Sequence, residues 1–245
     1  MDSIHKLNIL TNSQPELLAD EYSREYKEEV LPDLPISQYG NLESFVLYAM
    51  IRAFKLTNIV EIGTERQGRS SYLIQKALLK NGSTFYHTMC DFTEVIETAK
   101  ETMFDTTNTF FLAGDIRDTW EQIYLPDVDF LFIDAHHARD FAVWYLNTLI
   151  PKLRKNTLIH IHDINLSGDW KWRATWDSEA EEIILQHFAG IIPIKKELWL
   201  EDWCLNPEYE VKWNNIKKKL LCIGKFGARE LPYSCSATYW RKRYA

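Results

Sequence analysis

The sequence predicts an α/β protein whose core is a doubly wound, mostly parallel β-sheet. Between residues 57 and 163, short apolar segments of strand length alternate with longer amphipathic segments. Strands that are apolar throughout are buried on both faces, which requires helices on both sides of a parallel sheet. A glycine loop follows the first strand, and an acidic residue stands at or near the end of every strand. These ends share the edge where doubly wound sheets bind ligands.

The individual elements follow from apolar spacing. Residues 15–30 are expected to form a helix, and a second helix starts at Asn41, because apolar residues recur every three or four positions up to Ala53. After Asp163 the alternation stops, and only 178–189 is expected to be helical. The predicted strands after the glycine loop are 84–90, 109–112, 128–133 and 157–162, with 190–194 and 236–242 as later candidates. The predicted helices between them are 72–81, 93–103, 116–124 and 138–153.

Composition narrows the class of protein. The chain has 245 residues, a formal net charge of −7 and a pI of about 5.6, which argues against a broad nucleic-acid surface. Its four cysteines form no C-x-x-C pair, and no apolar run approaches the length of a membrane span. The first residues lack the pattern of a signal peptide. We therefore expect a soluble cytoplasmic protein, with no nucleic acid and no membrane among its partners.

The glycine loop lies in residues 57–71, TNIVEIGTERQGRSS. Gly63 is expected to make the turn off the strand and to let a ligand approach the backbone, and Ser70 or Ser71 is expected to cap the following helix. A dinucleotide site requires G-x-G-x-x-G, but only Gly63 and Gly68 are present. A carboxylate at Glu61 repels a pyrophosphate and attracts an amine or a sulfonium. The loop therefore favours a cationic ligand over a dinucleotide.

The motifs now resemble a known family. The pattern E-x-G-x(4)-G-x-S resembles motif I of the class I S-adenosylmethionine (SAM) dependent methyltransferases. The segments FIDAHH at 132–137 and LIHIHDI at 158–164 resemble methyltransferase family 24, which includes glycan-associated enzymes and is related to catechol-type O-methyltransferases. The resemblance implies a Rossmann-like sheet of seven strands with an antiparallel C-terminal edge strand.

The resemblance also implies roles at the strand ends. Asp91 takes the ribose hydroxyls of SAM, and Asp115 accepts from the adenine amino group, with Gly114 leaving room for the ring. Glu61 and Gly63 frame the methionine part. The cofactor-binding residues that it implies are Glu61, Gly63, Thr64, Gly68, Ser70, Asp91, Asp115 and Asp134.

Methyl transfer to a hydroxyl needs a base, a metal ion that acidifies the hydroxyl, or both. By the resemblance His137 is the base, with His136 as the alternative and Asp134 beside them; His160 is expected to be a core residue. The resemblance also implies a site for Mg²⁺ or Mn²⁺, with Asp134, Asp163 and Asn165 as the candidate ligands. Relatives place an Asp or Asn directly after the second aspartate, where this chain has Ile164. Without a metal ion, Asp134 serves the amine of SAM and Asp163 the acceptor.

The whole chain is expected to be a single methyltransferase domain. It divides into an N-terminal helical cap (1–56), a SAM-binding core (57–163), acceptor-side loops and a helix (164–215) and C-terminal edge strands (216–245). Six of the nine tryptophans lie in 164–215, and aromatic faces stack on sugar rings.

The expected activity is SAM-dependent O-methylation of a sugar, a glycan or another small polyhydroxyl acceptor. A homo-oligomer is compatible with the sequence. The alternatives are a nucleotide-dependent oxidoreductase and a non-catalytic binding module with the same fold.

Overall fold

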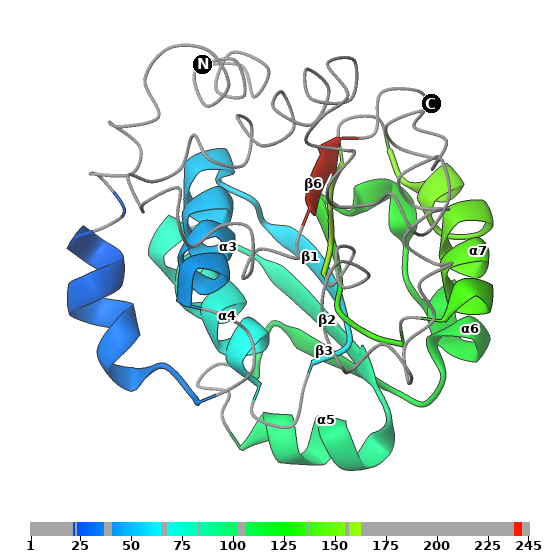
Figure 1. Ribbon diagram of the computed structural model, residues 1–245, viewed down its shortest axis with the longest axis horizontal. Helices are drawn as coiled ribbons and strands as arrows, with labels where there is room; N and C mark the ends of the chain where they lie inside the picture. Colours follow the sequence, from blue (N-terminus) through cyan, green and yellow to red (C-terminus); the bar gives the residue numbers. More distant parts are fainter. Residues whose placement is uncertain are drawn as a thin grey trace, which may run out of the picture.

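The computed structural model describes residues 22, 24–36, 41–64, 68–82, 84–101, 106–136, 138–154, 157–162 and 238–241. In this part of the chain, six strands form one sheet in the order β3-β2-β1-β4-β5-β6 (Figure 1). The strands are β1 (Asn58–Ile62), β2 (Tyr86–Asp91), β3 (Thr109–Ala113), β4 (Phe130–Ile133), β5 (Leu158–Ile161) and β6 (Thr238–Arg241).

Strands β1 to β5 are parallel, and β6 pairs with β5 in the antiparallel direction. The chain builds outward from β1 to β3 and then crosses back to β4 on the other side of β1. The switch point, where doubly wound sheets bind ligands, therefore lies between the ends of β1 and β4. The predicted doubly wound, mostly parallel α/β fold is confirmed. The count of seven strands stays a prediction.

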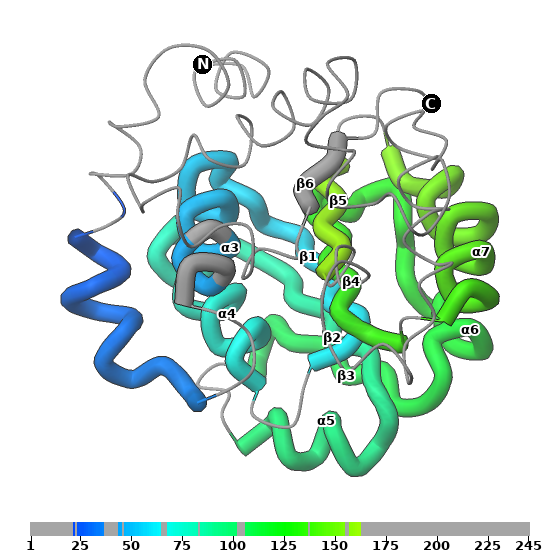
Figure 2. Tube along the Cα trace, in the orientation of Figure 1, coloured from blue at the N-terminus to red at the C-terminus, as the bar shows by residue number. Residues whose placement is uncertain are grey.

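Helices cover both faces of the sheet. Figures 1 and 2 show α3 and α4 on one side of the sheet and α6 and α7 on the other. The helices are α3 (Asn41–Phe54), α4 (Arg69–Asn81), α5 (Thr93–Lys100), α6 (Ile116–Thr119) and α7 (Arg139–Asn147). Short helical turns are η1 (Tyr26–Val30), η2 (Leu31–Asp33), η3 (Trp120–Gln122), η4 (Leu125–Asp127) and η5 (Ile150–Lys152).

Three of the helices end earlier than predicted. Helix α5 ends at Lys100 rather than at residue 103, and α6 and α7 each give way to a 3-10 turn, η3 and η5. Pro151 lies near the start of η5, where a residue without an N–H group begins a new turn more easily than it continues a helix. Of the predicted helix 15–30, the part before residue 22 lies outside the described residues.

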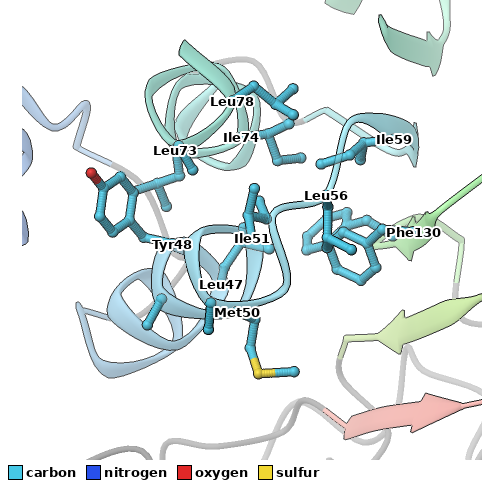
Figure 3. Close-up of a cluster of buried hydrophobic side chains, with 14 of the residues drawn as sticks. Leu47, Tyr48, Met50, Ile51, Leu56, Ile59, Leu73, Ile74, Leu78 and Phe130 are labelled. Atoms are coloured by element: carbon cyan, nitrogen blue, oxygen red, sulfur yellow. The ribbon is translucent and has the colours of Figure 1, made fainter. Parts of the chain in front are cut away.

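The alternation of strand side chains builds two apolar layers. On β1, Ile59 packs with α3 and α4, whereas Val60 and Ile62 pack on the α7 side. Figure 3 shows the first layer, in which Ile51 of α3 and Ile74 of α4 point toward each other. Helix α3 is buried beyond the predicted apolar face, because Leu47, Tyr48 and Ile51 are fully buried as well.

The N-terminal segment explains this extra burial of α3. The ring of Tyr26 lies 5.4 Å from Phe45 and 5.7 Å from Tyr48, measured between centroids. Arg52 of α3 donates to both carboxylate oxygens of Glu25, at 2.8 and 3.0 Å. Burial opposes ionisation of Glu25, but hydrogen bonds from Arg52 and Tyr48 outweigh it and lower the pKa of this carboxyl. The segment before α3 is thus fixed to the outside of this helix.

A buried set of polar side chains lies between α4 and the sheet. We call it the inner polar layer. Ser71 Oγ donates to Oε2 of Glu61 at 2.7 Å, and His87 Nε2 lies 3.0 Å from the same oxygen. One helical turn further on, Gln75 Nε2 donates to Thr109 Oγ1 at 2.7 Å. The layer therefore ties α4 to β1 and β3, and it joins β1 to β2 through His87.

None of the helices within the described residues is long and apolar enough to cross a membrane.

Candidate active site at the carboxyl edge of the sheet

The residues that follow the strands are held side by side by backbone hydrogen bonds. The N–H groups of Gly63, Gly114, Asp134 and His162 donate to the end of the neighbouring strand over 2.8 or 2.9 Å. The ladder therefore continues one residue beyond each strand. It brings the predicted strand-end residues to one edge, as the parallel arrangement requires.

Gly63 is required by a close approach of two backbone segments. Its φ is +84°, and a Cβ built on it would lie 1.8 Å from the carbonyl oxygen of Asp134. From the sequence, Gly63 was expected to make the turn after β1 and to let a ligand approach the backbone. The turn is confirmed by the positive φ. The structure adds a reason that sequence reasoning missed, since the contact partner is 71 positions away in the chain.

The carboxylate of Asp91 is fixed in orientation by the backbone. Its Oδ2 accepts from Thr64 N at 2.8 Å, and its Oδ1 accepts from Phe92 N at 2.7 Å. The Thr64 hydroxyl donates to Oδ2 as well, at 3.4 Å. Of the about four acceptor positions of a carboxylate, the one that these donors leave is on Oδ1. Asp91 is half-buried at the edge, next to the turn after β1. Asp91 can therefore accept from a ligand hydroxyl through Oδ1, and through Oδ2 in place of the Thr64 hydroxyl.

Glu61 lies deeper than the sequence suggested. It precedes the last residue of β1, is fully buried, and takes part in the inner polar layer with Ser71 and His87. Its second oxygen, Oε1, has no hydrogen-bond partner among the described residues. Sequence reasoning missed His87, because nothing in its spacing from Glu61 shows that parallel pairing of β1 and β2 brings the two together.

The start of α4 differs from the prediction. The helix begins at Arg69, and Gly68 is its N-cap residue in the left-handed conformation, with φ of 59° and no side-chain cap. The expected cap by Ser70 or Ser71 is therefore wrong. Both serines lie within the first turn, and the Ser71 hydroxyl donates to Glu61 instead. Gly68 is thus required for its backbone angle.

The carboxylate of Asp115 already accepts hydrogen bonds from an arginine. It caps α6 by accepting from Arg117 N at 2.9 Å, and the Arg117 guanidinium contacts both of its oxygens at 2.6 to 3.1 Å. Arg117 also reaches Asp140 at 3.1 Å. These hydrogen bonds from Arg117 lower the pKa of Asp115. A Cβ on the preceding Gly114 would meet no atom within 4 Å, which fits space for a flat ring.

At the end of β4, Asp134 pairs with a histidine from β5. Its Oδ1 lies 3.1 Å from Nδ1 of His162, and the two side chains are 23% and 9% exposed. His136 is exposed in the same loop. The predicted His137, Asp163 and Asn165 lie outside the described residues. Within the described ranges no group of three or more His, Cys, Asp or Glu side chains is placed to hold a metal ion.

His160 is confirmed as a core histidine. It is fully buried on β5, and its ring stacks on Phe132 with centroids 4.6 Å apart and an interplanar angle of 17°. Its ring lies 6.1 Å from that of His162, so the two share one face of the strand as predicted. Of the two, only His162 reaches the edge.

Comparison with known proteins agrees with this fold. Residues 60–164 match the family described as a methyltransferase domain, Methyltransf_24. No curated protein has a sequence that significantly matches the chain. Similar solved structures are an O-methyltransferase from Bacillus cereus in complex with SAH and a putative O-methyltransferase from Klebsiella pneumoniae.

The first is 18% identical, with a TM-score of 0.52, over 75% of this chain and 84% of that one. The second is 17% identical, with a TM-score of 0.53, over 75% and 82%. Cofactor-bound Rv0187 from MTB is 18% identical, with a TM-score of 0.53, over 75% and 82%. Identities this low establish a shared fold. Together, the match over 60–164 and the shared fold identify this segment as a methyltransferase domain of the family 24 type on a class I methyltransferase fold.

Proposed function

We propose that the protein is a SAM-dependent O-methyltransferase that acts on a hydroxyl of a sugar, a glycan or another small polyhydroxyl molecule. The observation that carries the proposal is the arrangement of Asp91, the Gly63–Thr64 turn and Asp134 at the switch point of a methyltransferase-type sheet. A similar structure, that of the Bacillus cereus O-methyltransferase, is in complex with SAH, which we take to be S-adenosylhomocysteine.

The cofactor is expected to lie across the ends of β1, β2 and β3. Asp91 would accept from the ribose hydroxyls, through the position that Phe92 leaves on Oδ1 and through Oδ2 in place of the Thr64 hydroxyl. The ring would lie in the space beside Gly114. Asp115 can accept from the adenine amino group only on the acceptor positions that Arg117 leaves free, so its share of the affinity is expected to be small.

The residues beyond β4 supply the proton chemistry. SAM provides a methyl group that is already activated as a sulfonium, so the protein has to align the hydroxyl and remove its proton. His137 is proposed as this base, with His136 in the exposed position beside it as the alternative. As the methyl–oxygen bond forms and the methyl–sulfur bond breaks, the hydroxyl proton passes to the imidazole.

The fit of a metal ion depends on Asp134. Oδ1 of Asp134 contacts His162, and Oδ2 is left for a cation. His162 would orient this carboxylate in the way that the outer partners of metal ligands do. Asp163 and Asn165 are proposed to complete an oxygen site for Mg²⁺ or Mn²⁺. If so, EDTA should suppress turnover while SAH binding largely survives. Full turnover in excess EDTA would leave the alternative in which Asp134 serves the amine of SAM and Asp163 the acceptor.

The acceptor class rests on the tryptophans of 164–215, which lie outside the described residues, and on the glycan-associated members of the family that the chain resembles. A cytoplasmic location, association into a homo-oligomer and the division into a helical cap, a core and acceptor-side loops remain predictions.

Calorimetry with S-adenosylhomocysteine tests the proposal most directly. The wild-type chain should bind it, Asp91→Ala should weaken binding by about 1–3 kcal/mol because the diol loses its acceptors, and Asp127→Ala should not change it. Asp127 is a matched control, because it is an exposed aspartate in η4, away from the carboxyl edge. Binding of NAD in place of S-adenosylhomocysteine would favour the oxidoreductase. Binding without turnover on any polyhydroxyl acceptor would favour a non-catalytic module.

A further inference from the structure

His87 is a fully buried histidine to which the chemistry above gives no role. Its Nε2 lies 3.0 Å from Oε2 of Glu61, and both side chains are 0% exposed. An ionised carboxylate only accepts hydrogen bonds, so with Glu61 ionised the hydrogen of this contact belongs to Nε2. Ser71 donates to the same oxygen from α4. Two donors from different elements thus act on a single carboxylate oxygen.

The other carboxylate oxygen of Glu61, Oε1, receives no hydrogen bond from either of these donors. Oε1 is buried and has no hydrogen-bond partner in the part of the chain that the structure describes. A buried carboxylate oxygen without a donor is costly, so it gains strongly from a donor that arrives with a ligand. Glu61 stands two positions before Gly63, at the switch point of the sheet. An ammonium group there would supply both a donor and the opposite charge.

We propose that His87 is a positioning residue for the methyl donor. By donating to Oε2, it holds the carboxylate of Glu61 so that Oε1 serves the amino-acid end of the donor. The inference rests on the proposed function, because it needs SAM at this edge. His87 acts only through Glu61, so it should affect the amino-acid end and leave the adenosine end, at Asp91 and Gly114, unchanged.

The test compares two ligands on the same variants. Calorimetry measures S-adenosylhomocysteine, which carries the amino-acid end, and adenosine, which lacks it. His87→Leu should weaken S-adenosylhomocysteine binding about tenfold and change adenosine binding less than about twofold, because only a charge-assisted hydrogen bond at Glu61 is lost. His87→Gln keeps an N–H donor at a similar reach, so it should recover most of the lost affinity.

The fold of each variant is checked by thermal unfolding in the same buffer. If His87→Leu is unfolded at the assay temperature, Ser71→Ala takes its place, because it removes the second donor to the same oxygen. It should likewise weaken S-adenosylhomocysteine binding and leave adenosine binding nearly unchanged. Equal weakening of both ligands in a folded variant, or unchanged S-adenosylhomocysteine affinity in folded His87→Leu, overturns the inference. A wild-type chain that binds neither ligand overturns the proposed function, and this inference with it.

Discussion

Two carboxylate–histidine pairs on this sheet have nearly the same geometry and very different surroundings. The inner pair, Glu61 and His87, joins β1 to β2 with a contact of 3.0 Å, and both side chains are fully buried. The outer pair, Asp134 and His162, joins the ends of β4 and β5 with a contact of 3.1 Å, and its side chains are 23% and 9% exposed.

Position along the strand accounts for the difference. Glu61 and His87 lie within their strands, where α4 covers them. Asp134 and His162 follow directly after theirs, at the edge where ligands bind. The same two chemical groups are thus expected to stabilise and position at one place and to take part in chemistry at the other. The predictions below test this division, from the largest expected effect to the smallest.

Gly63 lies where β1 meets β4, between the two pairs. Gly63→Val should abolish folding, because the added Cβ would lie within 1.8 Å of the Asp134 carbonyl oxygen and the residue would need a positive φ. Gly82→Ala is the control. It has a φ of +69° but no atom within 4 Å of the added Cβ, so it should cost only about 1–2 kcal/mol. Chemical denaturation measures both. Similar stability of the two variants would refute the close approach.

The inner pair should matter most for stability. His87→Leu leaves the Glu61 carboxylate buried with one donor, Ser71, and should lower the free energy of unfolding by about 3–5 kcal/mol. The double variant Glu61→Leu with His87→Leu removes the charge as well and should regain much of this loss. Urea unfolding of the three proteins gives the comparison. A double variant that is less stable than His87→Leu would show that the lone Glu61 carboxylate with Ser71 still stabilises the fold, and would contradict this account.

The loop beside the outer pair should matter most for turnover. His137→Ala should lower kcat by about 10²–10⁴-fold if His137 is the general base, with S-adenosylhomocysteine affinity close to wild type. His136→Ala is the matched control from the adjacent position. A larger loss of kcat in His136→Ala would move the base to His136. Normal kcat in both would mean that neither histidine takes the proton.

The outer pair itself should have an intermediate effect. His162→Leu should lower turnover about 10–100-fold, because Asp134 loses the partner that orients it. It should destabilise the fold less than His87→Leu does, because the Asp134 side chain is partly exposed and can be solvated. Steady-state kinetics and urea unfolding are the two measurements. Destabilisation as large as that of His87→Leu, without a change in kcat, would contradict the division between the inner and outer pairs.

Asp115 and Arg117 provide an exposed third pair at the same edge. The Arg117 hydrogen bonds lower the pKa of Asp115, so its share of stability is present above the carboxyl's ordinary pKa and lost as the pH falls through the lowered value. Arg117→Gln should raise the pKa of Asp115 toward the ordinary value of a carboxyl and barely change stability. Carboxyl NMR titration measures the shift. An unchanged pKa would mean that the pair does not form in solution.

The fold was predictable because its signals are local. The helix that starts at Asn41 follows from spacing alone, as does β4, which was predicted at 128–133 and spans Phe130–Ile133. The acids that follow strands mark the edge. Helix limits were less accurate. The cap of α4 was assigned to Ser70 or Ser71, because serine is a common cap, whereas tertiary contact with Glu61 uses the Ser71 hydroxyl.

The partners of the site residues could not be predicted. His87 contacts Glu61 across 26 positions, and His162 contacts Asp134 across 28, so both contacts depend on strand pairing. Arg117 is only two positions from Asp115, but its fork around that carboxylate depends on the turn into α6. Sequence reasoning placed the acids at the edge. The hydrogen-bond partners of these acids could be identified only from the positions of the neighbouring strands in the structure.

The inner polar layer also fixes α4 along its own axis. Ser71 and Gln75 are one helical turn apart, and each has a different partner on the sheet, Glu61 on β1 and Thr109 on β3. A slide of α4 by one turn, about 5.4 Å, would break both hydrogen bonds and place an amide where a hydroxyl fits. The first turn of α4 is therefore a stationary wall of the candidate site.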